Sequence, residues 1–356
     1  MNALIAWEAR ALFSIFAVVM CLSAPQSADA ATKYAAPNGG NFNSGNSPDS
    51  PWSAEKCFTS LSPGDTCIYL SGNYGAVKFM PEDNGTASAW ITHKCEIKHK
   101  CRFDQIRLDG NQFLHIVNVA SDSHYYDNTK TFTNPRMGIR GSSDIHLESV
   151  YVRGEPHKCA SGNPGPGCRG NDNEFNRYID LVRIGDNDSS NAVSSRIEIS
   201  GATEFVNGNH TTLQLYDDGD NDYCENSESD IWIHGTPEAP IRISNKYHHA
   251  VAIKGACRVL MEYVDFGPAG TGRSDLVQPT RSSIQQSGGI IHGSTMRGVV
   301  VRYSNFTKGG SATEKDKTKA HFEIGMFGRG VDGACFPHNS HYRPWGPVAV
   351  VGRVGD

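Results

Sequence analysis

The sequence of 356 residues lacks long stretches with helical hydrophobic periodicity, and it lacks a large excess of charge of either sign. The formal net charge of −5 gives no general attraction to nucleic acids or to acidic membrane surfaces. Glycine is abundant, with 37 residues, and asparagine, serine and aspartate crowd many short segments. Few helical patterns and many turn residues together indicate an all-β protein.

Several motifs that carry a defined chemistry are also missing. The sequence has no G-x-S-x-G signature of a Ser-His-Asp esterase, no phosphate-binding glycine loop and no interleaving of basic with aromatic residues. After residue 30, no stretch is long and apolar enough to cross a membrane. We therefore expect no nucleic-acid partner and no membrane span.

The N-terminus carries one short apolar segment. Residues 11–23 (ALFSIFAVVMCLS) follow Arg10 and precede the small residues at 27–30 (SADA). This segment is too short to span about 30 Å of hydrocarbon, whereas the pattern is typical of a secretory signal peptide. We predict cleavage after Ala30 and a secreted protein, extracellular or periplasmic.

Ten cysteines agree with an oxidising compartment. Three pairs that are close in sequence are expected to form disulfides: Cys57 with Cys67, Cys95 with Cys101, and Cys159 with Cys168. A metal site is the alternative for the C-x5-C pair, but no cysteine or histidine pair with zinc-site spacing accompanies it. Cys224 can pair with Cys257, which leaves Cys335 over. Because the end of the sequence also resembles an uncapped strand, a chain that continues beyond Asp356 is one expectation.

Short segments with the pattern apolar-x-apolar recur along the chain, with turn residues between them. They are Ile68/Leu70, Ile106/Leu108, Ile145/Leu147, Val150/Val152, Ile197/Ile199, Leu213/Leu215, Ile231/Ile233, Ile241/Ile243, Val251/Ile253 and Val299/Val301. Each predicts a short strand with one inward and one outward face. Three such strands per coil give the repeat of a parallel β-helix, and a β-sandwich is the structural alternative.

The stretch from Tyr34 to Phe79 has a distinctive order of elements. It predicts a strand at 34–36, a loop closed by Pro51-Trp52, a short helix at 53–61, a Pro-Gly-Asp turn and strands at 67–70 and 76–79. A helix this short needs a surface to lie on, and the open end of a stack of strands is the candidate.

This order of elements resembles the N-terminal cap and first coil of right-handed parallel β-helix proteins of the pectin-lyase-like superfamily. Residues 107–110 (RLDG) and 301–306 (VRYSNF) resemble coil phrases of the same superfamily. The resemblance implies an all-β fold, a right-handed parallel β-helix (solenoid) with an N-terminal cap. We predict a signal peptide at 1–30, the cap and first coil at 31–80, and the β-helix domain at 81–356, incomplete at its C-terminus if the chain continues.

Three polar segments interrupt the rhythm, at 121–137, 155–178 and 308–320. In a solenoid such insertions project from the coils, either to shape a binding groove or as solvated decoration.

An acidic run follows the strand predicted at 213–215. Asp217, Asp218, Asp220 and Asp222 lie around Gly219. Oxygen-rich loops of this kind suit Ca²⁺, although the spacing is not that of an EF-hand, and a solvated acidic turn is the alternative. Polysaccharide lyases with the resembled fold commonly use Ca²⁺ to neutralise a uronate carboxylate. The resemblance therefore implies Ca²⁺ as a cofactor and these four aspartates as its ligands.

Residues 246–255 (KYHHAVAIKG) carry the candidate catalytic lysine. If Val251 and Ile253 point inward, Ala250, Ala252 and Lys254 face outward, with His248 in phase. The outward face of this strand then carries two small side chains and one positively charged side chain, that of Lys254.

β-Elimination needs a base for the proton α to a uronate carboxyl group and a group that stabilises the charge that develops. We predict Lys254 as the base, with its pKa lowered by Arg258, and Arg258 or Arg297 as the group that holds the carboxylate. Lyases of the resembled superfamily use a lysine or arginine that projects from a strand face. No full catalytic motif of the superfamily aligns here, and a surface lysine on a solvated face is the alternative.

Four residues are candidates for substrate binding: His210, His248, His292 and Arg302. Arg302 follows the inward Val301 and should face outward, where it meets an anionic sugar or an acidic side chain of an adjacent coil. His210 stands at the start of a strand, either as a catalytic acid or as a hydrogen-bonding residue at a corner.

The sequence thus predicts a secreted polysaccharide lyase, a monomer that acts on an acidic, uronate-containing glycan. One alternative is a non-catalytic β-helix module that binds glycans or mediates adhesion. Another is a glycoside hydrolase, for which Asp217, Asp218 and Asp265 are candidates although no pair has a spacing that demands it. The lyase hypothesis requires Lys254 and the acidic run to share one face of the solenoid.

Overall fold

The computed structural model describes residues 30–122, 136–154, 181–186, 193–207, 211–217, 229–245, 249–254, 256–269, 291–294, 297–306 and 349–354. The chain divides into residues 1–31 and a second unit, Thr32–Asp356, which carries the fold described below. In these described ranges no helix has both the length and the apolar character that a membrane crossing requires. The predicted signal peptide lies almost entirely outside the described residues.

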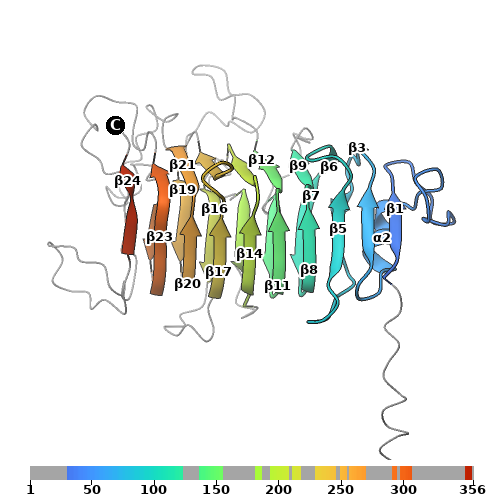
Figure 1. Cartoon of the computed structure of the whole chain (residues 1–356), viewed down its shortest axis with the longest axis horizontal. Coiled ribbons are helices and arrows are strands. Elements are labelled where there is room, and N and C mark those ends of the chain that lie inside the picture. Colours follow the sequence, from blue (N-terminus) through green and yellow to red (C-terminus); the bar gives the residue numbers. More distant parts are fainter. Residues whose placement is uncertain are drawn as a thin grey trace, which may run out of the picture. The chain divides into compact units, whose positions relative to one another are not determined.

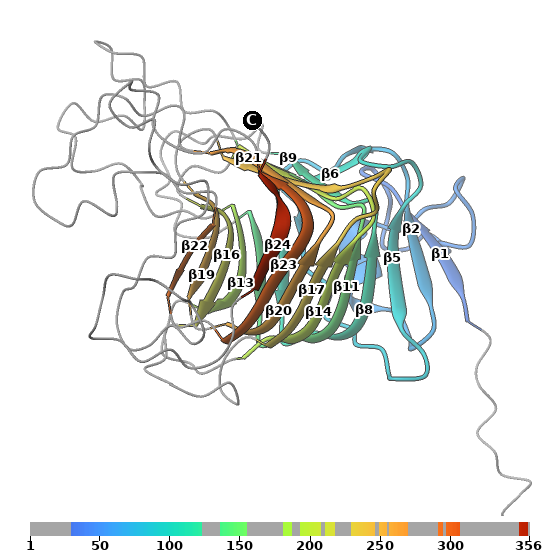
Figure 2. The same cartoon turned by 60° about the vertical axis from the view of Figure 1, so that its left-hand side comes forward.

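The strands form three parallel ladders, seen side by side in Figures 1 and 2. Ladder 1 consists of β1 (Thr32–Ala35), β2 (Thr66–Tyr69), β5 (Ile91–Cys95), β8 (Gln112–Val117), β11 (Ser143–Glu148), β14 (Ser195–Ser200), β17 (Ser229–His234), β20 (Cys257–Glu262), β23 (Arg297–Phe306) and β24 (Ala349–Val354). Ladder 2 consists of β3 (Gly72–Asn73), β6 (Cys101–Phe103), β9 (Ala120–Asp122), β12 (Tyr151–Arg153), β15 (Glu204–Val206), β18 (Ile241–Asn245) and β21 (Val264–Ala269), and it ends on the second half of β23. Ladder 3 consists of β4 (Lys78–Phe79), β7 (Gln105–Asp109), β10 (Met137–Arg140), β13 (Val182–Asp186), β16 (Thr211–Asp217), β19 (His249–Lys254) and β22 (Ile291–Ser294).

The chain visits the three ladders in turn and then returns to the first, one strand further along. Strands β8, β9 and β10, for example, are followed by β11, β12 and β13, each of which pairs in parallel with its predecessor on the same ladder. A connection between parallel strands is right-handed in nearly all proteins. The fold is therefore a right-handed parallel β-helix, as the sequence predicted.

The core lies between the three ladders and is built from the apolar-x-apolar pairs. In the pairs from Ile106/Leu108 to Val251/Ile253, both side chains are almost completely buried, and so is Val301. The alternation therefore has the predicted phase in these strands. Burial of two aliphatic side chains per strand stabilises each coil by several kcal/mol, at roughly 1.5–3 kcal/mol for each side chain.

Three details of the predicted pattern are wrong. In β2 the buried residues are Cys67 and Tyr69, while Ile68 and Leu70 are only partly buried, so this strand has the opposite phase. Ala250, expected on the outer face of β19, is completely buried. The first polar interruption is also shorter than 121–137, because β9 reaches Asp122 and β10 begins at Met137.

Left-handed backbone conformations recur at fixed places on ladder 1. One set lies where the chain leaves ladder 1. Four of its members come directly after a strand and the fifth lies within β23: Asn118, Ser149, Gly201, Tyr263 and Tyr303. A second set is the second residue of five successive strands: Phe113, Asp144, Arg196, Asp230 and Arg258. Most of these are not glycine, and each such residue carries a steric cost that the neighbouring coils must offset. The repeated positions mark the corners where the chain turns from one ladder to the next.

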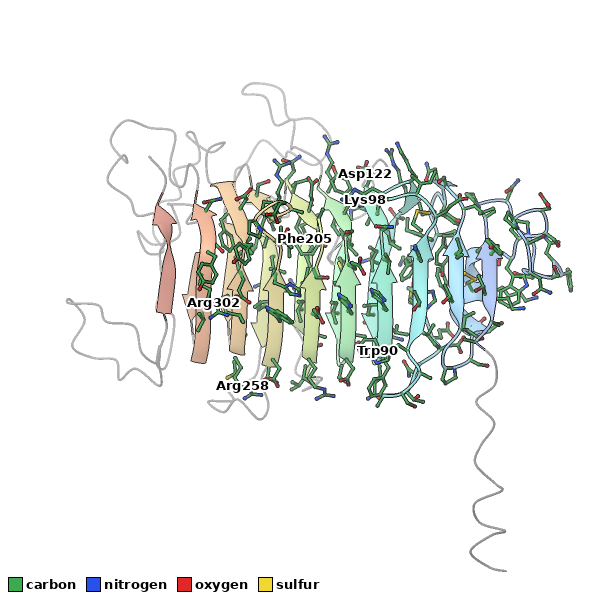
Figure 3. All side chains as sticks on the ribbon, in the orientation of Figure 1. Trp90, Lys98, Asp122, Phe205, Arg258 and Arg302 are labelled. Atoms are coloured by element: carbon green, nitrogen blue, oxygen red, sulfur yellow. A yellow bond between two sulfur atoms is a disulfide. The ribbon has the colours of Figure 1, made fainter. Side chains whose placement is uncertain are left out.

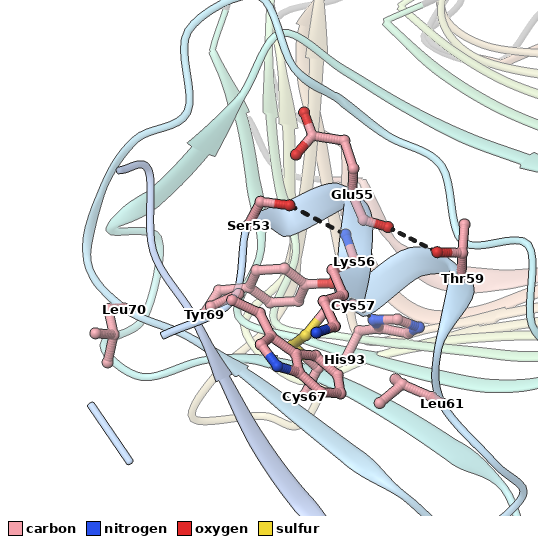
Figure 4. Close-up of a disulfide and its surroundings, with 12 residues drawn as sticks. Ser53, Glu55, Lys56, Cys57, Thr59, Leu61, Cys67, Tyr69, Leu70 and His93 are labelled. Atoms are coloured by element: carbon pink, nitrogen blue, oxygen red, sulfur yellow. Dashed lines mark hydrogen bonds between the residues drawn. A yellow bond between two sulfur atoms is a disulfide. The ribbon is translucent and has the colours of Figure 1, made fainter. Parts of the chain in front are cut away.

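The short helix α2 (Ala54–Thr59) begins at Ser53, whose hydroxyl accepts a hydrogen bond from the Lys56 amide (Figure 4). Its buried Phe58 packs against the rings of Tyr69, Phe79, His93 and Phe103, with centroid distances of 5.2 to 6.4 Å. The predicted helix is thus present and three residues shorter than 53–61. Its role as an N-terminal cap stays a prediction.

Two of the predicted disulfides are confirmed. Cys57 is bonded to Cys67, joining α2 to β2 (Figure 4), and Cys95 is bonded to Cys101. Cys257 is disulfide-bonded, but its predicted partner Cys224 lies outside the described residues. The same holds for the pair Cys159 and Cys168, and for Cys335.

Candidate functional site

Ladder 3 brings together three of the residues predicted for catalysis and binding. Asp217 is the last residue of β16 and Lys254 the last residue of the neighbouring β19. The register pairs Tyr216 with Lys254, and Ala252 with His292 of β22. Asp217, Lys254 and His292 therefore lie on three adjacent strands of one sheet, with Asp217 and Lys254 within one residue of each other in register.

The predicted arginines lie on ladder 1 instead. Arg258 is the second residue of β20, four residues after Lys254 and past the corner of the same coil. Arg297 is the first residue of β23 and pairs with Cys257. Four residues span at most about 14 Å of extended chain, so Arg258 stays close to the end of β19. The arginines and the lysine flank one corner of the solenoid but belong to different sheets.

The Arg258 guanidinium already has a partner. Its Nε and Nη2 atoms donate to the two carboxylate oxygens of Asp230, at 2.6 and 2.8 Å. These hydrogen bonds raise the pKa of Arg258 and lower the pKa of Asp230. An equivalent bidentate pair joins Arg196 to Asp144, two strands earlier. Arg258, labelled in Figure 3, thus belongs with Asp230, Arg196 and Asp144 to a row of alternating charges along one edge of ladder 1.

The remaining predicted residues cannot be placed. His210, His248, Asp218, Asp220 and Asp222 lie outside the described residues. For Asp217, Lys254, His292 and Arg297 the structure describes the backbone of the strand but not the side chain.

The outer face of ladder 1 carries a continuous set of polar and aromatic side chains, which we call the outer row. Its members are His115, His146, Glu148, Glu198, Ser200, Trp232, His234, Glu262 and Arg302. Of these, only Arg302 was predicted from the sequence as a site residue. They alternate with buried apolar residues along the strands and come into line because the strands are in register.

Short hydrogen bonds connect the outer row from coil to coil. His115 Nε2 lies 2.9 Å from Glu148 Oε2, His146 Nε2 lies 2.7 Å from Ser200 Oγ, and His234 Nε2 lies 2.9 Å from Glu198 Oε1. Further along, Trp232 Nε1 donates to Glu262 Oε2 at 3.0 Å, and Arg302 Nε donates to Glu262 Oε1 at 2.7 Å. These contacts join six successive strands, from β8 to β23.

Aromatic stacking adds to these contacts. The imidazoles of His115 and His146 are stacked at 4.4 Å with an interplanar angle of 5°, and Trp232 stacks on His234 at 3.7 Å. Trp232 remains 41% exposed. Beyond it, the exposed Tyr303 stacks on Tyr263.

Three groups in the outer row have a shifted pKa. The hydrogen bond to Glu262 raises the pKa of Arg302. Burial lowers the pKa of the His146 imidazole, which outweighs the opposing effect of Glu198. For Glu262, burial favours a higher pKa, but hydrogen bonds from Arg302 and Trp232 hold the pKa below its usual value. Arg302, labelled in Figure 3, and Glu262 form an ion pair at the end of the row that lies on β20 and β23.

The signal for the outer row was present in the sequence. In the apolar-x-apolar pairs Ile145/Leu147, Ile197/Ile199 and Ile231/Ile233, the middle residues are His146, Glu198 and Trp232. Reading the middle residue of each pair in coil order would have identified a polar face.

No protein-family model and no curated protein matches this sequence. Among solved structures, the pectate lyase Pel9A is similar with a TM-score of 0.51 and 10% sequence identity, over 92% of this chain and 78% of that one. A rhamnogalacturonan lyase has a TM-score of 0.45 and 11% identity, over 77% of this chain and 68% of that one. The lacto-N-biosidase of family GH136 from Eubacterium ramulus has a TM-score of 0.43 and 11% identity, over 77% and 51% of the two chains. The likeness to the pectate lyase shows that the chain shares its right-handed parallel β-helix fold.

Proposed function

We propose that this protein is a polysaccharide lyase that cleaves an acidic, uronate-containing glycan by β-elimination. The observation that carries the proposal is the register of ladder 3. Strands β16 and β19 are neighbours, and they end at Asp217 and Lys254, so the acidic run and the candidate base leave the same end of one sheet.

In this reaction the Lys254 amine removes the proton from the carbon α to the uronate carboxyl group. The electron pair of that C–H bond forms a carbon–carbon double bond, and the C–O bond to the departing sugar breaks at the β carbon. The departing oxygen takes up a proton. A lysine serves as a base only when its amine is uncharged, which neighbouring cations favour. Arg297, which begins β23 past the same corner, supplies such charge in the proposal and can hold the uronate carboxylate, whereas Arg258 can do so only by giving up its hydrogen bonds to Asp230.

The acidic run that begins at Asp217 is proposed to hold Ca²⁺. Carboxylate oxygens are the hard ligands that this ion prefers, and Asp217, Asp218, Asp220 and Asp222 offer four of them. When bound, Ca²⁺ would neutralise the uronate carboxylate and so acidify the adjacent C–H bond. His210, His248, His292 and Arg302 are proposed to contact the sugar chain.

Secretion completes the proposal. The two disulfides agree with an oxidising compartment, where polymeric glycans are met as substrates. Cleavage after Ala30 would release the mature chain, which we expect to act as a monomer.

The test is the absorbance of unsaturated uronate products on pectate, alginate and glycosaminoglycans, with Ca²⁺ and with a chelator. We expect product on at least one substrate and a Lys254→Met variant slower by about 10²-fold or more, since general-base catalysis contributes that much. Lys94→Met is the matched control, because Lys94 is an exposed strand lysine on ladder 1. Equal rates for the wild type and Lys254→Met would refute Lys254 as the base.

A second function, glycan binding without cleavage, is favoured by Trp232. Its exposed ring, between the hydrogen-bonded Glu262 and the imidazole of His234, is a platform on which a sugar ring can stack. Quenching of tryptophan fluorescence by a glycan, lost in Trp232→Ala and without any unsaturated product, would support this function. Product formation that is unaffected by Trp232→Ala would argue against it.

A further inference from the structure

We propose that His115, His146 and Glu148 form a binding site for a borderline divalent transition metal, with Zn²⁺ as the representative ion. The site lies on the outer face of ladder 1, at the end of the outer row closest to the N-terminus. It is separate from the Ca²⁺ role proposed for the acidic run, and it needs neither a sugar nor catalysis.

The first argument is convergence. One ring nitrogen of His115, one ring nitrogen of His146 and a carboxylate oxygen of Glu148 all lie within 4.8 Å of one another. Across the described ranges, this is the one group of three such residues that comes so close. The residues come from two adjacent strands, β8 and β11, whose register places His146 directly opposite His115. Glu148 follows two residues later on the same face of β11 and reaches across to His115 at 2.9 Å.

The second argument is preorganisation of the imidazoles. Parallel neighbouring strands lie about 4.8 Å apart, so histidines at opposite positions have their rings side by side. Here the rings are stacked at 4.4 Å and are parallel within 5°. The residues on either side of each histidine, Leu114 and Ile116 for His115, Ile145 and Leu147 for His146, are buried in the core and fix the register of the two strands. A rigid sheet that holds the two histidines opposite each other lowers the entropic cost of assembling a metal site.

The third argument is the chemistry of the ligand atoms. Imidazole nitrogen and carboxylate oxygen both bind borderline divalent ions, and Glu148 Oε2 already lies 2.9 Å from His115 Nε2.

The distances require only small side-chain movements. Zn²⁺ bonds to imidazole nitrogen and carboxylate oxygen are about 2.0–2.2 Å, so tetrahedral ligand atoms are separated by roughly 3.3 Å. The contact of 2.9 Å must therefore lengthen slightly, and the longer separations, which are at most 4.8 Å, must shorten. Because an imidazole binds a metal ion in the plane of its ring, the two stacked rings must also turn about their side-chain torsions so that one nitrogen of each faces the ion.

The site has an open side and a nearby second carboxylate. The side chains of His115 and His146 are 28% and 24% exposed, so an ion can enter from solvent. Glu198 Oε1 lies 3.6 Å from His146 Nε2 and is fixed by its hydrogen bond to His234. Glu198 can accept a hydrogen bond from a metal-bound water, and three protein ligands plus water are typical of an accessible zinc site.

The ligand set also selects the class of ion. Imidazole favours Zn²⁺, Ni²⁺ and Cu²⁺, whereas Ca²⁺ and Mg²⁺ prefer six or more oxygen ligands. Excess Ca²⁺ or Mg²⁺ should therefore leave Zn²⁺ at this site in place.

The experiment is a calorimetric titration of the tag-free, chelator-treated mature protein with Zn²⁺. The variants are His146→Ala, which removes the central ligand, and Glu148→Gln, which keeps the volume but removes the charge. His99→Asn is the control, because His99 is also a half-buried, ring-stacked histidine on the same molecule, and asparagine tolerates its left-handed backbone.

We expect the wild type and His99→Asn to bind Zn²⁺ equally, and both site variants to bind it at least tenfold more weakly, within the range of about 10–100-fold seen when metal sites lose a supporting group. X-ray absorption of the Zn²⁺-loaded wild type should show two imidazole ligands. Equal affinity of all four proteins would overturn the proposal, and so would displacement of Zn²⁺ by millimolar Ca²⁺. Should His146→Ala fail to fold, Glu148→Gln decides the result.

Discussion

Replacement of His93 tests how the aromatic cluster around α2 limits stability at acidic pH. His93 lies on β5, is completely buried and is surrounded by the rings of Phe58, Tyr69 and Phe79. Its Nδ1 atom is hydrogen-bonded to the Tyr69 hydroxyl at 2.8 Å, and within the described structure its Nε2 atom has no hydrogen-bond partner. Burial lowers the pKa of His93 from 6.5 to about 3. The folded protein therefore holds this ring in its neutral form.

The sign and the size of the effect follow from the two pKa values. Because the pKa is lower in the folded state, the unfolded chain takes up a proton first as the pH falls. The stabilising contribution is complete above about pH 6.5 and is lost progressively as the pH falls toward 3. One pKa unit corresponds to 1.36 kcal/mol, so the free energy of unfolding falls by about 2.6 kcal/mol between pH 7.5 and 4.5 because of this residue alone.

The assay compares the wild type with His93→Asn in urea unfolding at both pH values. Asparagine does not titrate, and its amide can still accept a hydrogen bond from Tyr69. Any cavity left by the substitution destabilises the variant at both pH values alike, and all other ionisable groups are shared. The wild type should therefore lose about 2.6 kcal/mol more than the variant on acidification. An equal loss in both proteins would refute a neutral, buried His93.

Three further predictions concern the region around α2 and the edge of ladder 1. Joint replacement of Cys57 and Cys67 by serine should lower the free energy of unfolding by about 2.7 kcal/mol. This value is the loop-closure entropy term for a sequence separation of 10, and urea unfolding without reductant measures the loss. Phe58→Ala should cost about 3–5 kcal/mol, because the ring is 4% exposed and contacts several others; a loss below 1 kcal/mol would mean that the cluster is loosely packed. Arg258→Ala should change the same quantity by less than about 1 kcal/mol, since Arg258 and Asp230 are about half exposed and water screens such pairs. A larger loss would show that the row of alternating charges acts as a network.

Most of the coil structure could be predicted, because the side chains that the apolar-x-apolar pattern places inward are the ones that the structure buries. In β11, β14 and β17 the aliphatic pairs point inward, and nothing else in these strands competes for the interior. In β2 the pattern was misleading, because Cys67 must face Cys57 and Tyr69 fills the aromatic cluster. A covalent bond and a large ring there outweigh the burial of Ile68. The phase of a strand near a disulfide is therefore set by the cysteine.

The candidate catalytic residues could be predicted individually but not as an arrangement. Lys254 and Asp217 each end an alternating strand, and this was visible in the sequence. That the two strands are neighbours depends on the number of residues in the coil between them, which includes loops of variable length. The partner of Arg258 was equally hidden, because Asp230 is 28 residues earlier and comes close only through the register of β17 and β20.

The outer row shows how the core determines the geometry of a surface. His115 and His146 are 31 residues apart in sequence, yet they stack because Leu114 pairs with Ile145 and Ile116 with Leu147. If β11 shifted by one residue relative to β8, His146 and Glu148 would turn inward, and Ile145 and Leu147 would become exposed. Losing the burial of two such side chains costs roughly 3–6 kcal/mol, which is far more than a hydrogen bond between His115 and Glu148 contributes. The apolar residues therefore hold the proposed metal ligands in line, and the site should keep its geometry when the ligands themselves are replaced.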